Sequence, residues 1–172
     1  QSLKRALPDN ELELYYQPIM DVEQNQPGSA EVLIRWNRDG EEQITPDLFI
    51  PLAEEIGLVD EFGHWVFEQA CLRAREWQAQ HPGFRLSINL SARQLEDPTL
   101  ASKFDAVLQQ TGSDPSLLTL EVTETAFMRG ADLGAKVLGE LRQTGMRVVI
   151  DDFGTGYASL KYLRNLPVDG LK

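Results

Sequence analysis

Cysteine and histidine are scarce in this sequence, and acidic residues outnumber basic ones. The 172 residues include one cysteine and two histidines, and 16 Lys and Arg stand against 27 Asp and Glu, so the formal net charge is -11. A single cysteine excludes an internal disulfide, and we expect Cys71, which follows Phe67 and Ala70 in an apolar helical context, to be a core residue. The acidic balance argues against nucleic-acid binding, because phosphate backbones are bound by clustered Lys and Arg.

Long apolar runs are lacking too. No run approaches the ~20 residues of a membrane span, and we expect no signal peptide. We therefore expect a cytoplasmic location and no direct membrane contact for this segment, while the parent protein can be membrane-anchored elsewhere. Because residue 1 is Gln and not Met, we expect the segment to come from a longer chain.

Strand-like and helical segments alternate along the chain. The strand segments are 12–18, 29–36, 84–90, 117–123, 147–151 and 168–172, and the helical segments are 47–56, 60–80, 100–111, 131–143 and 157–164. This alternation predicts a mostly parallel sheet covered by helices, either doubly wound or most of an eight-stranded barrel. Thr45-Pro46-Asp47 is a helix start signal, and Pro27-Gly28 and Asp39-Gly40 predict turns.

Four polar side chains fall on matching faces of four different strand segments: Glu31, Asn89, Glu121 and Asp151. An isolated buried carboxylate is costly, so we expect a cation among them. Oxygen ligands without His or Cys are the set that binds Mg²⁺ or Mn²⁺. The adjacent Asp152 could reach a second ion, which would explain two acids side by side at a strand end. The other interpretation, that each acid caps a helix or pairs with an arginine, is less economical for four residues together.

Several stretches resemble one known family, the EAL-type phosphodiesterases that cleave cyclic diguanylate. The matching stretches are YYQPIMD (15–21), EVLIRW (31–36), INLSARQL (88–95), LEVTETA (120–126), IDDFGTGYASL (150–160) and LPVDGLK (166–172). They occur in family order across nearly the whole chain. Val32 departs from the family tripeptide, which has Ala there, and we expect only a small packing effect because Val32 faces the helices.

The resemblance implies an α/β fold, a modified TIM (β/α)8 barrel with one antiparallel strand and a site at the carboxyl ends of the strands. It also implies that residues 1–10 form a linker helix from an upstream sensory or GGDEF domain. Residues 11–172 would then be about two-thirds of an EAL domain, truncated after the sixth strand, with the C-terminal part absent from this chain. A homodimer is left open.

The resemblance also assigns roles to individual residues. Two ions, Mg²⁺ or Mn²⁺, would be bound by Glu31, Asn89, Glu121 and Asp151 at the first site and by Asp152 at the second. Lys172 would position the attacking water, and Glu124 would anchor the loop that follows Asp152.

Three further residues would contact the substrate. Arg35 would hold a phosphate, because its fork geometry suits paired oxygens, and Gln17 and Leu33 would contact the nucleotide. The other interpretation of Arg35 is an ion pair with Glu31 at the rim.

The function that this resemblance implies is metal-dependent hydrolysis of cyclic di-GMP to linear pGpG in bacterial signalling. The alternative is a catalytically silent receptor that binds cyclic di-GMP and signals through an attached domain. We favour the enzyme because the chain keeps every metal ligand that falls within its length. A glycosidase with Glu121 and Glu124 as its carboxylate pair is a third possibility, but residues three apart on a strand point to opposite faces.

Overall fold

Strands and helices alternate in the structure as the sequence predicts. The computed structural model describes residues 3–23, 25–38, 43–128, 131–154 and 167–172. The strands are β1 (Leu12–Asp21), β2 (Gln26–Trp36), β3 (Arg85–Leu90), β4 (Leu118–Thr123), β5 (Arg147–Asp151) and β6 (Gly170–Leu171). The α-helices are α1 (Pro46–Ile56), α2 (Val59–Gln78), α3 (Leu100–Thr111), α4 (Glu124–Met128) and α5 (Ala131–Gln143). Short 3₁₀ turns are η1 (Leu3–Arg5), η2 (Gln94–Glu96) and η3 (Pro115–Leu117).

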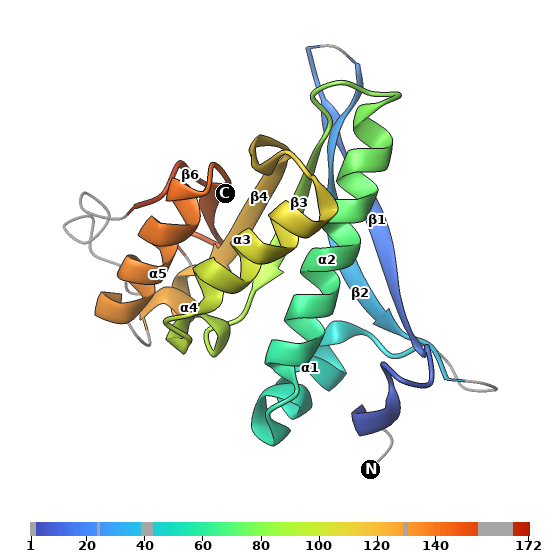
Figure 1. Ribbon diagram of the computed structural model, residues 1–172, viewed down its shortest axis with the longest axis vertical. Coiled ribbons are helices and arrows are strands. Elements are labelled where there is room, and N and C mark those ends of the chain that lie inside the picture. The colour runs from blue at the N-terminus through green and yellow to red at the C-terminus, as the bar shows by residue number, and fades with distance from the viewer. Residues whose placement is uncertain (1–2, 24, 39–42, 129–130, 155–166) are drawn as a thin grey trace.

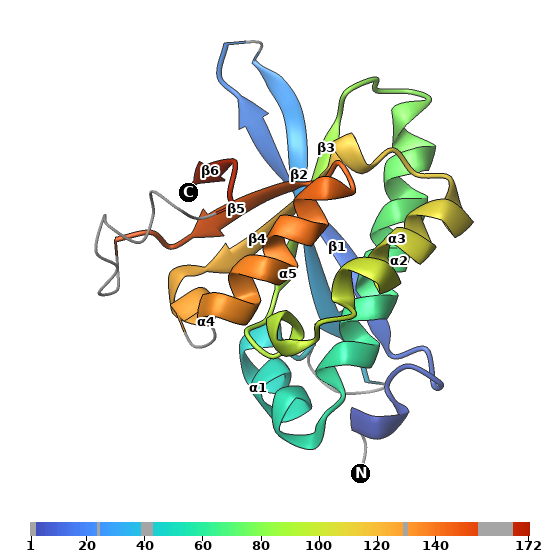
Figure 2. The ribbon, with the colours of Figure 1, turned by 60° about the vertical axis from the view of Figure 1, so that its left-hand side comes forward.

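The strands form one sheet in chain order, β1-β2-β3-β4-β5-β6. β1 and β2 pair as an antiparallel hairpin, and each later strand pairs in parallel with the one before it. Helices α2, α3 and α5 lie in succession along one face of this sheet (Figures 1 and 2). Because the parallel strands run the same way, their carboxyl ends meet at one edge.

The main core lies between this sheet and these helices. The helix-facing side chains of β3, β4 and β5 are almost fully buried: Leu86, Ile88, Leu118, Leu120, Val122, Val148 and Ile150. Phe67 of α2 stacks on Phe104 of α3, with ring centroids 3.7 Å apart. Val32 belongs to the same cluster and is 3% exposed, so it faces the helices as the strand alternation predicts.

A second, smaller core lies around α1 and the start of the chain. Leu3 and Ala6 pack with Trp36, Phe49 and Phe62. The residues that precede β1 therefore contribute to the core through η1 and the following turn. Their expected role as a linker from an upstream domain stays a prediction.

Most predicted boundaries are confirmed, and a few differ. Helix α1 begins at Pro46, after Thr45, and ends at Ile56, and the capping residue Gly57 has a left-handed φ of 78°. The turn predicted at Pro27-Gly28 is wrong, because β2 runs through both residues and pairs with β1 across an irregular register near Ile19 and Met20. Predictions for 157–164 and for Asp39-Gly40 lie outside the described residues. In the described parts of the chain, no helix combines the length and apolar character needed to cross a membrane.

Candidate active site at the carboxyl ends of the strands

The ammonium group of Lys172 is surrounded by carboxylates from three different strands. Its Nζ lies 2.9 Å from Glu121 Oε2, 3.6 Å from Glu31 Oε2 and 3.6 Å from Asp151 Oδ2. These acids belong to β4, β2 and β5, and Lys172 follows β6 directly. Three of the four residues predicted as ligands of the first metal therefore converge on one positive charge.

The buried carboxylate of Glu121 requires the positive charge of Lys172 as its partner. The Glu121 side chain is 3% exposed, and a buried carboxylate without a partner is strongly unfavourable. Partial burial by itself lowers the pKa of Lys172, but the hydrogen bond to Glu121 and the charges of Glu121, Glu31 and Asp151 outweigh it. The pKa of Lys172 is therefore raised above its ordinary value, and the lysine stays protonated at neutral pH.

Asn89 joins the cluster through Glu31. Its Nδ2 donates to Glu31 Oε1 at 2.9 Å, which leaves the amide oxygen of Asn89 as its remaining acceptor. Asn89 and Glu121 are direct partners in the parallel pairing of β3 and β4. Strand register alone thus places the amide and the carboxylate side by side on one face of the sheet.

The chain turns sharply where β5 ends. Asp152 has a φ of 55°, a left-handed conformation that Asp tolerates better than most residues. Its backbone N–H donates to Oδ1 of Asp151 at 2.9 Å. The carboxylate of Asp151 thus accepts this N–H through Oδ1 and faces the Lys172 ammonium through Oδ2.

Glu124 contacts that loop from the neighbouring strand end. Glu124 is the first residue of α4 and is only 4% exposed. Its Oε2 accepts a hydrogen bond from the Gly154 N–H at 2.9 Å. Thr155 and Ser159, whose hydroxyls would be further candidate donors to Glu124, lie outside the described residues. Glu121 and Glu124 thus serve different partners, which weakens the glycosidase interpretation.

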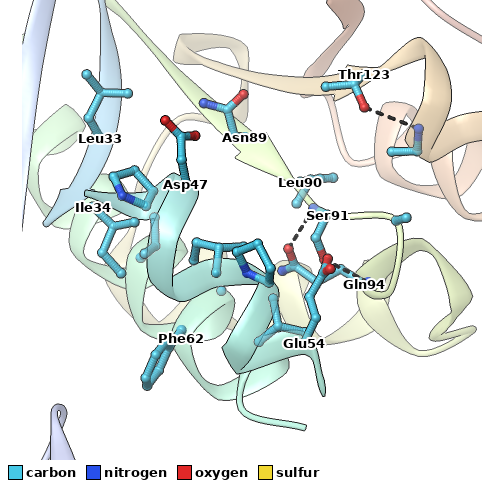
Figure 3. Close-up of a pocket in the computed structure, with 18 of the residues that line it drawn as sticks. Leu33, Ile34, Asp47, Glu54, Phe62, Asn89, Leu90, Ser91, Gln94 and Thr123 are labelled. Atoms are coloured by element: carbon cyan, nitrogen blue, oxygen red, sulfur yellow. Dashed lines mark hydrogen bonds between the residues drawn. The ribbon is translucent and has the colours of Figure 1, made fainter. Parts of the chain in front are cut away.

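A cavity of about 630 Å³ opens beside the cluster. Glu31 and Asn89 line its edge on the sheet, and α1, the start of α2 and the segment after β3 form its other walls (Figure 3). Leu33 lines it too, as expected for a residue that contacts a ligand. The volume lies within the range of small-molecule sites.

Arg35 and Gln17 lie on the β1–β2 hairpin. Nη1 of Arg35 donates to the Ile34 carbonyl at 2.9 Å, and its guanidinium carbon is 5.8 Å from the centroid of the Tyr15 ring. No ion pair between Arg35 and Glu31 is found within the described residues, so the rim ion pair is not formed there. Gln17 is exposed and lies directly opposite Glu31 in the antiparallel register.

The donor set suits a hard divalent cation. Three carboxylates and one amide oxygen supply only oxygen ligands, and the position of the Lys172 ammonium is a point where these carboxylates already meet a cation. Among the described residues, no group of three or more His, Cys, Asp or Glu side chains is close enough to hold a metal ion as it stands. Binding there would require the carboxylates to draw closer together around the ion.

Comparison with known proteins gives this arrangement a family. The model of the EAL domain family matches residues 1–172. The chain belongs to the EAL domain family. This EAL domain is 40% identical over 173 residues to the cyclic di-GMP phosphodiesterase NbdA of Pseudomonas aeruginosa, covering all of this chain and 22% of NbdA. It is 40% identical over 171 residues to the bifunctional diguanylate cyclase/cyclic di-GMP phosphodiesterase MucR of the same organism, covering 99% of this chain and 25% of MucR.

A solved structure gives the same answer at the level of the fold. The PaMucR phosphodiesterase in complex with c-di-GMP superposes with a TM-score of 0.93 and 39% identity, over 99% of this chain and 69% of that chain. The expected fold, a modified TIM barrel with one antiparallel strand, is confirmed. The EAL domain described here spans about a quarter or less of the curated relatives' length.

Helix α1 supplies site residues that the motifs did not single out. Asp47 lies in the first turn of α1, and its carboxylate points into the cavity toward Asn89 and Leu33 (Figure 3). Glu54, near the other end of the helix, also lines the cavity. The sequence shows a helix start signal with Asp47 in the first turn. It does not show that α1 packs against the strand ends, and this packing directs Asp47 toward the cavity.

Proposed function

We propose that this EAL domain hydrolyses one phosphodiester bond of cyclic di-GMP and releases linear pGpG. One observation carries the proposal: the carboxylates of Glu31, Glu121 and Asp151 converge on the ammonium group of Lys172. They do so beside a cavity large enough for a nucleotide. The relatives named as cyclic di-GMP phosphodiesterases and the solved c-di-GMP complex support the choice of substrate.

The reaction is proposed to depend on two divalent cations, Mg²⁺ or Mn²⁺. The first would be held by the oxygens of Glu31, Asn89, Glu121 and Asp151, and the second by Asp152. When bound, such ions polarise a phosphate oxygen and lower the pKa of a coordinated water.

The residues of the chain itself bind and orient the reactants. Lys172 carries a positive charge at the carboxylate cluster, where it would donate a hydrogen bond to the attacking water. Arg35 would bind a phosphate oxygen, and Gln17 and Leu33 would contact the nucleotide. Glu124 would fix the backbone at Gly154 and so the direction of Asp152.

Hydrolysis and silent binding are separated by one experiment. The full-length protein is incubated with cyclic di-GMP and either Mg²⁺ or Mn²⁺, and the products are resolved by chromatography. We expect a linear dinucleotide, no product in the presence of EDTA, and loss of product for Glu31→Ala. Tight binding of cyclic di-GMP without turnover under any metal would refute hydrolysis and favour the receptor.

The cellular context of the domain is a further part of the proposal. We expect a cytoplasmic location and an attached sensory or GGDEF domain. The name of one relative, which is both a diguanylate cyclase and a cyclic di-GMP phosphodiesterase, supports a second domain. The sequence leaves a homodimer open, and the mass of the full-length protein in solution would test it.

A further inference from the structure

Asp169 lies where α5, β5 and the segment leading into β6 meet. Nε of Arg142 is 3.1 Å from both carboxylate oxygens of Asp169, and Nη2 is 2.6 Å from Oδ1. The Val148 N–H donates to Oδ2 at 2.9 Å. One carboxylate thus ties an outer helix, the start of β5 and the last segment of the chain together.

The same segment leads within three residues to Lys172. It is held to β5 by main-chain bonds from Asp169 N to Val148 O at 2.7 Å and from Lys172 N to Ile150 O at 2.8 Å. Between these bonds, β6 has only two residues. A pairing this short specifies its own register weakly.

Register decides where Lys172 points. Side chains alternate across a strand, so a slip of one residue would turn the lysine away from Glu121, Glu31 and Asp151. The carboxylate of Asp169 opposes such a slip, because its bond to the Val148 N–H requires these two residues to stay side by side. The paired N–H groups of Arg142 fix the orientation of the carboxylate in turn.

We propose that Asp169, oriented by Arg142, is a positioning residue for Lys172: it sets the register of β6 so that the ammonium reaches the carboxylates of the active site. Its catalytic consequence rests on the function proposed above. Neither residue touches the carboxylate cluster through a described contact, so any effect on turnover passes through Lys172.

The matched control is Asp97. Its carboxylate also combines an ion pair, 2.7 Å from Lys103 Nζ, with a backbone N–H, that of Thr99 at 2.8 Å, and the exposed fractions of the two aspartate side chains are similar, 20% and 24%. Asp97 belongs to the approach to α3 and makes no described contact with the carboxylate cluster. Asp97→Ala should therefore lower the free energy of unfolding about as much as Asp169→Ala does, and it should leave turnover unchanged.

The first measurement is steady-state hydrolysis of cyclic di-GMP by the full-length protein. We expect Asp169→Ala to lower kcat about tenfold, with KM unchanged within about twofold. Arg142→Lys, which keeps the charge but loses the fork, should lower kcat less and also serves if Asp169→Ala fails to fold. In a Lys172→Met background, Asp169→Ala should lower the residual kcat no further. An undiminished tenfold loss in that background would overturn the proposal.

The second measurement does not depend on activity. Hydrogen exchange of the full-length protein should show faster exchange in Asp169→Ala at the amides of Lys172 and Phe153, which pair with Ile150 O and Lys172 O, and unchanged exchange in β3 and β4. Unchanged exchange at these amides would refute the anchor, as would a uniform rise across the sheet. If the wild type does not hydrolyse cyclic di-GMP, the proposed function fails, and the exchange data alone decide whether Asp169 sets the register.

Discussion

The two faces of β4 are equally buried and chemically opposite. Leu120 is fully buried among apolar side chains under the helices. Glu121, the next residue, is 3% exposed and directs its carboxylate to the Lys172 ammonium. Burial by itself therefore does not separate core from active site in this molecule. What separates them is the partner that each face requires, apolar contact on one side and a cation on the other.

The largest effect is expected on the charged face. Asp151→Asn removes one charge from the carboxylate cluster and should lower hydrolysis about a thousandfold while the fold persists. Kinetics and thermal unfolding of the full-length protein would measure both. Asp105→Asn, an exposed substitution on α3, is the control and should change neither. Full turnover by Asp151→Asn at saturating Mg²⁺ would contradict the metal-ligand role.

The opposite face should respond in stability. Leu120→Ala leaves a cavity under the helices and should lower the free energy of unfolding by about 3 kcal/mol. Denaturant unfolding measures this loss, and the kcat of the remaining folded protein should stay near that of the wild type. A large fall in kcat at full folding would mean that the two faces of β4 are not independent.

The loop after β5 gives a smaller effect. Glu124→Gln removes the charge that accepts the Gly154 N–H and should lower turnover about tenfold by loosening Asp152. Raised Mg²⁺ or Mn²⁺ should then restore part of the activity, because the second metal site is weakened and the first is intact. Metal titrations of the wild type and the variant test this, and identical curves would leave Glu124 without a role in metal binding.

Asp97 tests a charge outside the site. Bonds from the Lys103 ammonium and the Thr99 hydroxyl lower its pKa to about 2. The pKa of an unfolded Asp is about 3.9, so the contribution of Asp97 is full above that pH and disappears as the pH falls toward 2. Asp97→Ala should thus cost about 1 kcal/mol of unfolding free energy at pH 7 and much less near pH 2. A constant difference across this range would contradict the assignment.

The smallest effect is expected at Cys71, on the apolar side. Burial raises the pKa of its thiol to about 12, so the reactive thiolate is nearly absent at pH 8. A thiol reagent should leave Cys71 unmodified in the native protein and label it fully in denaturant. Rapid labelling of the native state would show that the core opens near α2.

The sequence by itself determined the elements and the list of candidate ligands. Periodicity is a local property, so the alternation of strands and helices, the start of α1 and the inward face of each strand could be read without a structure. The same alternation singled out Glu31, Asn89, Glu121 and Asp151, because each is a polar residue on the strand face opposite the apolar one; only Glu121 of the four is buried in the structure.

Tertiary structure decided which residues of different elements meet. The convergence of three carboxylates on Lys172, the anchor between Arg142 and Asp169, and the inward turn of Asp47 join residues that are far apart in the chain. Such pairs depend on strand order, register and helix packing, which sum many weak contacts over the whole fold. The turn misplaced at Pro27-Gly28 has the same origin, because pairing with β1 outweighs a local turn preference.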